Sequence, residues 1–160
     1  MILKMKGESG ERGLTIIELA VVVVIIAIAA LFITPALGEW IDNYRIKQAA
    51  RDIVSALQTA KMRAISTHRE YRVVFDLDHE TYQLQRGNKA SGSDSWSQEG
   101  STWEAPRNVD IDHTNVTNDT FQFNPDGTCT SGSIFLDNTK GRRYRILVLY
   151  TGRMRIQEGW

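Results

Sequence analysis

The sequence predicts an α+β fold in which a long N-terminal α-helix, with a membrane half and an amphipathic half, packs on an antiparallel β-sheet domain. Two observations predict it. An unbroken apolar run of 15 residues extends from Leu19 to Ile33, and an amphipathic stretch follows it. From Tyr71 onward the hydrophobic period changes to the alternation of strands. One helix followed by a run of strands is typical of α+β domains.

The apolar run belongs to a longer apolar segment. From Leu14 to Leu37 the chain has 24 residues, and only Thr15, Glu18, Thr34 and Pro35 interrupt it. As a helix this segment is about 36 Å long, enough to cross a hydrocarbon core of about 30 Å. The pattern predicts a transmembrane or filament-core helix over residues 14–40.

Three interpretations of this segment compete. It has the parts of a cleaved secretory signal, with Lys4, Lys6 and Arg12 as the basic region and Ala27-Ile28-Ala29 as the cleavage box. It also fits a simple signal anchor. Neither interpretation accounts for Glu18, which is an acidic residue inside an apolar helix.

A lone carboxylate costs roughly 2.5–3.5 kcal/mol near the centre of a membrane helix and usually marks a function. The residues within helical reach of Glu18 are Leu14, Val21 and Val22, all apolar. The partner of Glu18 is therefore expected on another chain or at a new terminus.

The segment Gly13-Leu14-Thr15-Ile16-Ile17-Glu18-Leu19 resembles the class III signal of type IV pilins and type II secretion pseudopilins. The resemblance implies that residues 1–13 are a leader that prepilin peptidase removes between Gly13 and Leu14, with N-methylation of Leu14. It implies that Glu18 pairs with the terminal amine of a neighbouring subunit. Leu14 departs from the commoner phenylalanine.

Pro35 stands where pilins usually carry a proline. It is expected to kink or loosen the helix near Ile33–Gly38, because it removes one helical hydrogen bond. The simpler alternative is that Pro35 ends the membrane helix.

The resemblance also implies location and partners. It places the chain in the bacterial inner membrane as a single-pass protein, with the globular domain in the periplasm or extracytoplasmic space. The implied partners are other pilin or pseudopilin subunits, prepilin peptidase and the inner membrane.

Residues 41–160 are expected to form the globular domain, with an amphipathic helix over 41–66 and a β domain over 70–158. One helix is expected from about Leu14 to Ile65, because apolar residues recur at alternating steps of four and three. This apolar stripe comprises Ile46, Ala50, Ile53, Leu57, Ala60 and Ala64.

The β domain is expected to be largely a meander. Tyr71–Leu77 and Thr81–Gln85 form a predicted hairpin, and residues 86–108 form a long polar loop that is mobile or a partner surface. In that loop Trp96 and Trp103 either pack back on the domain or contact a partner. Further strands are expected at Val109–Asp112, Thr120–Phe123, Ser133–Leu136, Arg142–Tyr150 and Met154–Gln157.

The second half of the chain resembles the H-type minor pseudopilins and the FimT-like minor pilins. The similarity is carried by Phe123–Gly127, Gly132–Leu136 and Gly152–Arg155. It implies a minor subunit of either a type II secretion pseudopilus or a type IV pilus, since both systems share the assembly signal.

No motif for catalysis or phosphate binding is found, so the chain is expected not to be an enzyme and to need no cofactor. The three histidines have no ligand-like spacing. Asp76, Asp78 and Glu80 could bind a cation, but a solvated turn is favoured and no metal site is predicted. Cys129 has no partner for a disulfide and is a buried small residue or a free thiol.

The formal net charge of zero hides a segregation of charge. Residues 73–139 carry a net charge of −8, and residues 140–160 carry one of +5. The chain therefore has an acidic middle and a basic end.

Within the basic end, alternation along a strand places Arg143 and Arg145 on one face, and likewise Arg153 and Arg155. Antiparallel pairing across the turn at Gly152 would join them into a basic ribbon that could hold phosphates. Gly152-Arg153-Met154-Arg155 also matches the Gly-Arg-x-Arg motif that in FimT-like pilins is associated with incoming DNA, so DNA is a possible partner. The alternatives are a solvated edge and pairing with the acidic middle segment.

Overall fold

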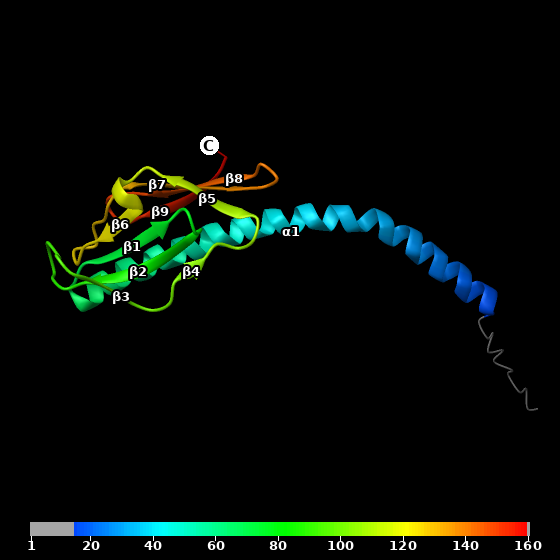
Figure 1. The fold of residues 1–160 in the computed structure, drawn as a ribbon, viewed down its shortest axis with the longest axis horizontal. Coiled ribbons are helices and arrows are strands. Elements are labelled where there is room, and N and C mark those ends of the chain that lie inside the picture. The colour runs from blue at the N-terminus through cyan, green and yellow to red at the C-terminus, as the bar shows by residue number, and fades with distance from the viewer. Residues whose placement is uncertain (1–14, 160) are drawn as a thin grey trace, which may run out of the picture. The chain divides into compact units, whose positions relative to one another are not determined.

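The computed structural model describes residues 15–159, apart from the side chains of residues 31–37 and 39. The chain divides into two compact units, Met1–Gly38 and Glu39–Trp160. The predicted α+β class is confirmed (Figure 1). The elements are α1 (Ile16–Thr67), β1 (Tyr71–Asp76), β2 (Thr81–Gly87), β3 (Trp96–Gln98), β4 (Trp103–Glu104), β5 (Val109–Thr114), the 3₁₀ turn η1 (Thr117–Asp119), β6 (Thr120–Phe123), β7 (Gly132–Asn138), β8 (Arg143–Val148) and β9 (Met154–Glu158).

In the N-terminal unit, α1 begins at Ile16, close to the predicted start. Helical structure continues through Pro35, so the alternative in which this proline ends the helix is wrong. Among the residues that the structure describes, none of the helices has both the length and the apolar character that a membrane crossing needs. Within the segment predicted as a helix over residues 14–40, residues 16–40 are helical.

In the C-terminal unit, the rest of α1 supplies one wall of the core. All six residues of the predicted apolar stripe are buried, as are Ala49 and Ala56 beside them. Five of these eight positions are alanines, and all five are buried. The amphipathic helix expected over residues 41–66 is confirmed.

The strands of this unit form two antiparallel sheets rather than one meander. The first has the order β3-β2-β1-β6, with β4 also pairing with β2, and the second has the order β5-β7-β8-β9. The predicted hairpin is present, with Asp76 opposite Thr81. The meander fails at β6, which leaves its chain neighbours and pairs with β1, while β5 and β7 pair with each other.

The segment between β2 and β5 is not a mobile loop, which was one of its two predicted alternatives. Its strands β3 and β4 both pair with β2. Trp96 lies under the guanidinium of Arg72, 4.2 Å from carbon to ring centroid, and Trp103 stacks on Tyr82 at 5.5 Å. Both tryptophans therefore pack on the domain, which is one of the two predicted alternatives.

Candidate functional site

The predicted processing residues Gly13 and Leu14 lie outside the described residues. Glu18 lies in the first turn of α1, where the backbone N–H of Glu18 donates to Oγ1 of Thr15 at 3.3 Å. Thr15 is thus the N-cap, and an acid at the third helical position suits the positive end of the helix dipole. This local role accounts for an acid at residue 18 without a partner chain.

The apolar residues before and after Glu18 are exposed on all sides of the helix within the N-terminal unit. They run through consecutive positions, so no face of this segment is polar. Exposed apolar surface of this extent is typical of a segment that lipid or other proteins bury. The residues are Ile16, Ile17, Leu19, Val21, Val22, Val23, Val24, Ile25, Ile26 and Ile28.

The basic end of the chain forms the β8–β9 hairpin of the second sheet. Residues 144, 146 and 148 of β8 are buried, so the alternate residues face outward. Arg155 lies opposite Leu147, and Arg145 lies opposite Gln157, which puts Arg145 and Arg155 on one outward face. We name this set of four arginines the basic strand pair: Arg143, Arg145, Arg153 and Arg155.

The charges around the basic strand pair are partly compensated. Arg142, beside it, pairs with Glu158, and Arg143 lies opposite Asp137 of β7. Burial, Asp112 and Asp110 raise the pKa of Asp137, and Arg143 partly offsets them. Among the described residues, Arg153 and Arg155 have no ion-pair partner. Within the basic strand pair, the acidic segment therefore lies beside Arg143 and forms no ion pair with Arg153 or Arg155 among the described residues.

An aromatic ladder continues this face across the sheet. The guanidinium carbon of Arg145 lies 5.8 Å from the ring centroid of Phe135, and Nε of Arg145 is buried without a hydrogen-bond partner among the described residues. His113 of β5 stacks on Phe135 at 4.1 Å with an interplanar angle of 14°. The ladder fixes the direction of Arg145, so this arginine is less adaptable than the other three.

Gly152 has a structural reason to be glycine. It is buried with φ of +70°, and Nζ of Lys61 on α1 donates to the carbonyl oxygens of Thr151 at 3.1 Å and of Gly152 at 3.2 Å. A Cβ at Gly152 would lie 2.6 Å from Lys61 Nζ and 2.8 Å from the carbonyl oxygen of Gly127. The glycine of the motif therefore packs the turn onto α1, and the arginines beside it point away from that contact.

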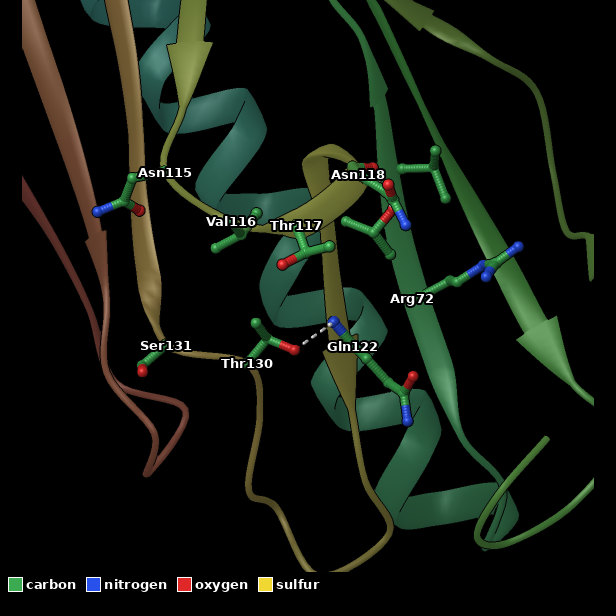
Figure 2. A pocket seen from close by; sticks show the side chains of 10 residues that line it. Arg72, Asn115, Val116, Thr117, Asn118, Gln122, Thr130 and Ser131 are labelled. Atoms are coloured by element: carbon green, nitrogen blue, oxygen red, sulfur yellow. Dashed lines mark hydrogen bonds between the residues drawn. The ribbon is translucent and has the colours of Figure 1, made fainter.

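A polar groove of about 640 Å³ lies on the other sheet (Figure 2). Amides and hydroxyls dominate its wall, and Gln122 donates its backbone N–H to Oγ1 of Thr130 at 3.3 Å. No histidine, cysteine or carboxylate lines the groove among the described residues, so a nucleophile with its base is not found there. Its lining residues are Arg72, Val74, Asn115, Val116, Thr117, Asn118, Thr120, Gln122, Thr130 and Ser131.

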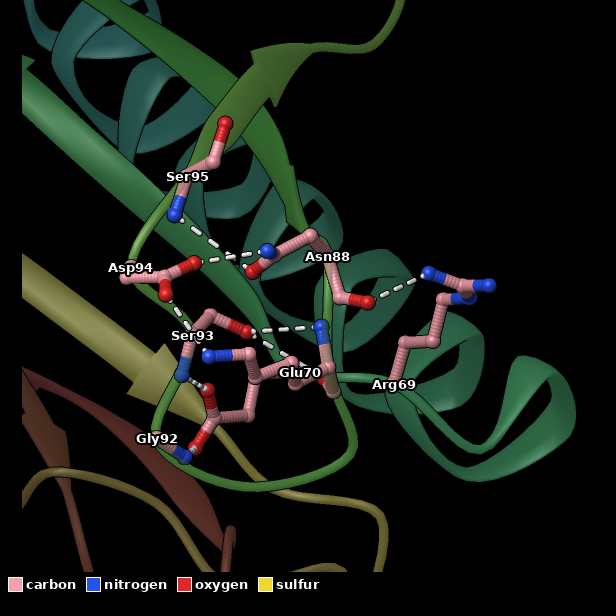
Figure 3. A network of polar contacts seen from close by, with 8 residues as sticks. Arg69, Glu70, Asn88, Gly92, Ser93, Asp94 and Ser95 are labelled. Carbon is pink, nitrogen blue, oxygen red and sulfur yellow. Dashed lines mark hydrogen bonds and ion pairs between the residues drawn. The ribbon is translucent and has the colours of Figure 1, made fainter.

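A buried carboxylate orders the loop after β2 (Figure 3). Glu70 is 3% exposed and accepts hydrogen bonds from the backbone N–H groups of Gly92 at 2.9 Å and Ser93 at 2.6 Å. Burial raises the pKa of Glu70, but these hydrogen bonds outweigh it, and the pKa lies below its usual value. A Cβ at Gly87 would lie 2.2 Å from Oγ of Ser93, so the loop closes tightly on β2.

The other residues singled out from the sequence do not converge. Oε2 of Glu80 accepts the backbone N–H of Ile111 at 2.5 Å, whereas Asp76 contacts Nδ1 of His79 at 3.0 Å. The hydrogen bond to Asp76 raises the pKa of His79. The carboxylates near residues 76–80 thus serve separate local contacts. Cys129 is buried, its Sγ lies 3.2 Å from the carbonyl oxygen of Leu149, and burial raises its pKa.

Solved structures of other proteins have a similar fold. The minor pseudopilin EpsH from the Type 2 Secretion System of Vibrio cholerae superposes with a TM-score of 0.59 at 12% identity, over 71% of this chain and 97% of EpsH. The type IV minor pilin FimU of Pseudomonas aeruginosa gives a TM-score of 0.57 at 18% identity, over 74% and 92%. At these identities the likeness establishes the fold.

Among curated proteins, no sequence matches this chain significantly. The family model described as type II transport protein GspH matches residues 49–152, which include the amphipathic part of α1 and most of both sheets. The predicted resemblance to H-type minor pseudopilins and pilins is thereby confirmed. The chain belongs to the GspH family of type II transport proteins.

Proposed function

We propose that this chain is a minor subunit of a type II secretion pseudopilus or a type IV pilus, with a structural and not a catalytic role. The carrying observation is the helix surface after Glu18, which is apolar and exposed on every side. Such a surface needs burial in lipid before assembly and among other helices afterwards. Membership of the GspH family supports this assignment.

In this proposal the chain enters the inner membrane through residues 14–40, with the globular domain on the periplasmic or extracytoplasmic side. Prepilin peptidase cleaves between Gly13 and Leu14 and methylates the amine of Leu14. In the filament, Glu18 pairs with the terminal amine of a neighbouring subunit. Because the carboxylate is costly while unpaired in an apolar setting, the pairing selects one register between adjacent helices.

The mass of the mature N-terminal peptide tests the processing step. We expect a protein that begins with N-methyl-Leu14 in the membrane fraction of cells that contain prepilin peptidase. In cells lacking the peptidase, the same protein should retain residues 1–13. A terminus near Ala30 would instead identify an ordinary secretory signal, and an uncleaved chain in both strains would identify a simple anchor.

A second candidate function is capture of DNA by the basic strand pair. It is favoured by one specific observation, that Arg153 and Arg155 are exposed and have no ion-pair partner among the described residues. Phosphates bind to such a face without sequence preference and with strong salt dependence. Replacement of Arg153 and Arg155 by glutamine is the test, and loss of salt-dependent DNA binding is the expected result.

A further inference from the structure

A second cavity of about 300 Å³ lies between the amphipathic part of α1 and the first sheet. The basic strand pair belongs to the second sheet. One wall is helical and the other is the edge where β4 pairs with β2, with Trp103 opposite Tyr82. Its lining residues are Asp52, Ser55, Ala56, Thr59, Tyr82, Trp103 and Glu104.

The side chain of Tyr82 lines this cavity. The residue is 5% exposed, and its ring is held between Phe75 and Trp103, each with a centroid distance of 5.5 Å. Among the described residues, no hydrogen bond to the Tyr82 hydroxyl is formed. Burial and the nearby charge of Asp52 raise the pKa of Tyr82 to about 12, so the phenol stays protonated.

Two carboxylates of the cavity also lack a cation. Asp52 accepts only the side-chain amide of Gln48 at 2.8 Å, and Glu104 forms no ion pair with any described residue. Arg63, which also lies on α1, pairs with Glu99. The cavity therefore combines an aromatic wall with two exposed carboxylates that have no ion-pair partner among the described residues.

We propose that this cavity binds a guanidinium group, which an arginine side chain of a neighbouring protein or a free guanidino compound would supply. A planar guanidinium stacks on the indole of Trp103 while its N–H groups donate to the carboxylates of Asp52 and Glu104 and to the hydroxyl oxygen of Tyr82. An ammonium group is tetrahedral and has no planar face that could stack on the indole. A hard metal ion needs six or more oxygen ligands, which this aromatic wall does not provide.

Fluorine NMR of the full-length chain in detergent, labelled with 5-fluorotryptophan, tests the site directly. The Trp103 signal is assigned by its loss in Trp103→Phe. N-acetyl-arginine amide should shift this signal saturably, with a Kd in the millimolar range expected for a single small group. N-acetyl-citrulline amide, which has the same shape without the charge, should leave it unmoved. An absent arginine shift, or equal shifts with both compounds, would overturn the proposal.

Variants separate the site from general effects on the fold. Asp52→Asn with Glu104→Gln should weaken binding of the arginine amide at least tenfold, because both charged acceptors are lost. Tyr82→Phe retains the packed ring and should weaken it about fivefold. Asp78→Asn removes an exposed acid outside the cavity and should change nothing. Unchanged binding in the double variant contradicts the site, even if Tyr82→Phe proves unstable.

A second arm identifies the source of the guanidinium and rests on the proposed function. If the source is a neighbouring subunit, the Asp52/Glu104 double variant should enter filaments several-fold less than the wild type while Asp78→Asn enters normally. If the source is a free compound, incorporation is unchanged and only the NMR binding is lost. Failure of the filament proposal itself leaves the NMR arm intact, so the two failures are distinguishable.

Discussion

Gly152 shows at the scale of one residue how a sequence motif can combine packing with function. Its positive φ and its contact with Lys61 and the Gly127 carbonyl leave no space for a side chain. The two arginines that follow have no such packing constraint. The turn therefore requires the glycine of the Gly-Arg-x-Arg sequence, and only the two arginines are candidates for binding a ligand.

Gly152→Ala should lower the free energy of unfolding by about 2–4 kcal/mol, because a positive φ and an overpacked contact are both penalised. Gly141→Ala is the matched control. Gly141 has φ of +77° and nothing within 4 Å of a built Cβ, so only the backbone penalty of about 1 kcal/mol applies. Chemical denaturation measures both. Equal losses would show that the Lys61 contact does not constrain this turn.

Glu70 makes the stability of the fold depend on pH in the acidic range. Since its folded-state pKa lies below the ordinary 4.5, its contribution is present above pH 4.5 and is lost as the pH falls through the lower folded value. Between pH 5 and pH 3, Tm should therefore fall more steeply for the wild type than for Glu70→Gln, and the variant should be less stable at pH 7. Thermal unfolding followed by circular dichroism measures this, and parallel pH profiles would contradict the role given to Glu70.

At the scale of elements, long periodic patterns could be predicted from the sequence and short ones could not. The stripe from Ile46 to Ala64 and the β1–β2 hairpin have enough repeats to define their period, and both are confirmed. Strands β3 and β4 are three and two residues long, too short to show alternation. The pairing of β6 with β1 depends on partners far apart in the chain, which local patterns do not encode.

The same distinction applies to the candidate sites. The shared face of the basic strand pair follows from alternation and one turn, so the sequence sufficed to predict it. The contact of Lys61 with the turn at Gly152 crosses 90 residues of chain and needed the tertiary structure. The cavity around Tyr82 and Trp103 was missed for the same reason, although Trp103 had been noted as a residue that packs or binds.

The proposed binding of DNA by the β8–β9 hairpin leads to a prediction about its salt dependence. If Arg153 and Arg155 each neutralise a phosphate, the double glutamine variant should reduce the slope of log K against log salt by roughly 2. Mobility shifts at several salt concentrations measure this slope. Arg107→Gln removes one positive charge from an exposed position in the segment before β5 and should leave the slope nearly unchanged. An equal effect per charge removed in both variants would assign the binding to net charge alone.

At the scale of the whole molecule, the zero net charge conceals a division of roles. An apolar helix with one acid near its start occupies the N-terminal unit, and the two-sheet domain carries the acidic and basic surfaces. The family match begins only at residue 49, so the assembly role of the first helix is a proposal from its residues. The position of Glu18 at the positive end of the helix dipole gives the strongest competing explanation for that acid.

Incorporation of Glu18→Gln into filaments tests the proposed assembly most directly. The variant retains the size and the Thr15 cap, which uses a backbone N–H, and removes only the charge. Filament-bound protein, measured as the ratio of sheared to membrane fractions, should fall tenfold or more, since a charge-assisted hydrogen bond contributes roughly 1.5–3 kcal/mol. Asp78→Asn, an equal change in the globular domain, should assemble like the wild type. Normal incorporation of Glu18→Gln would contradict assembly through the Glu18–amine pair.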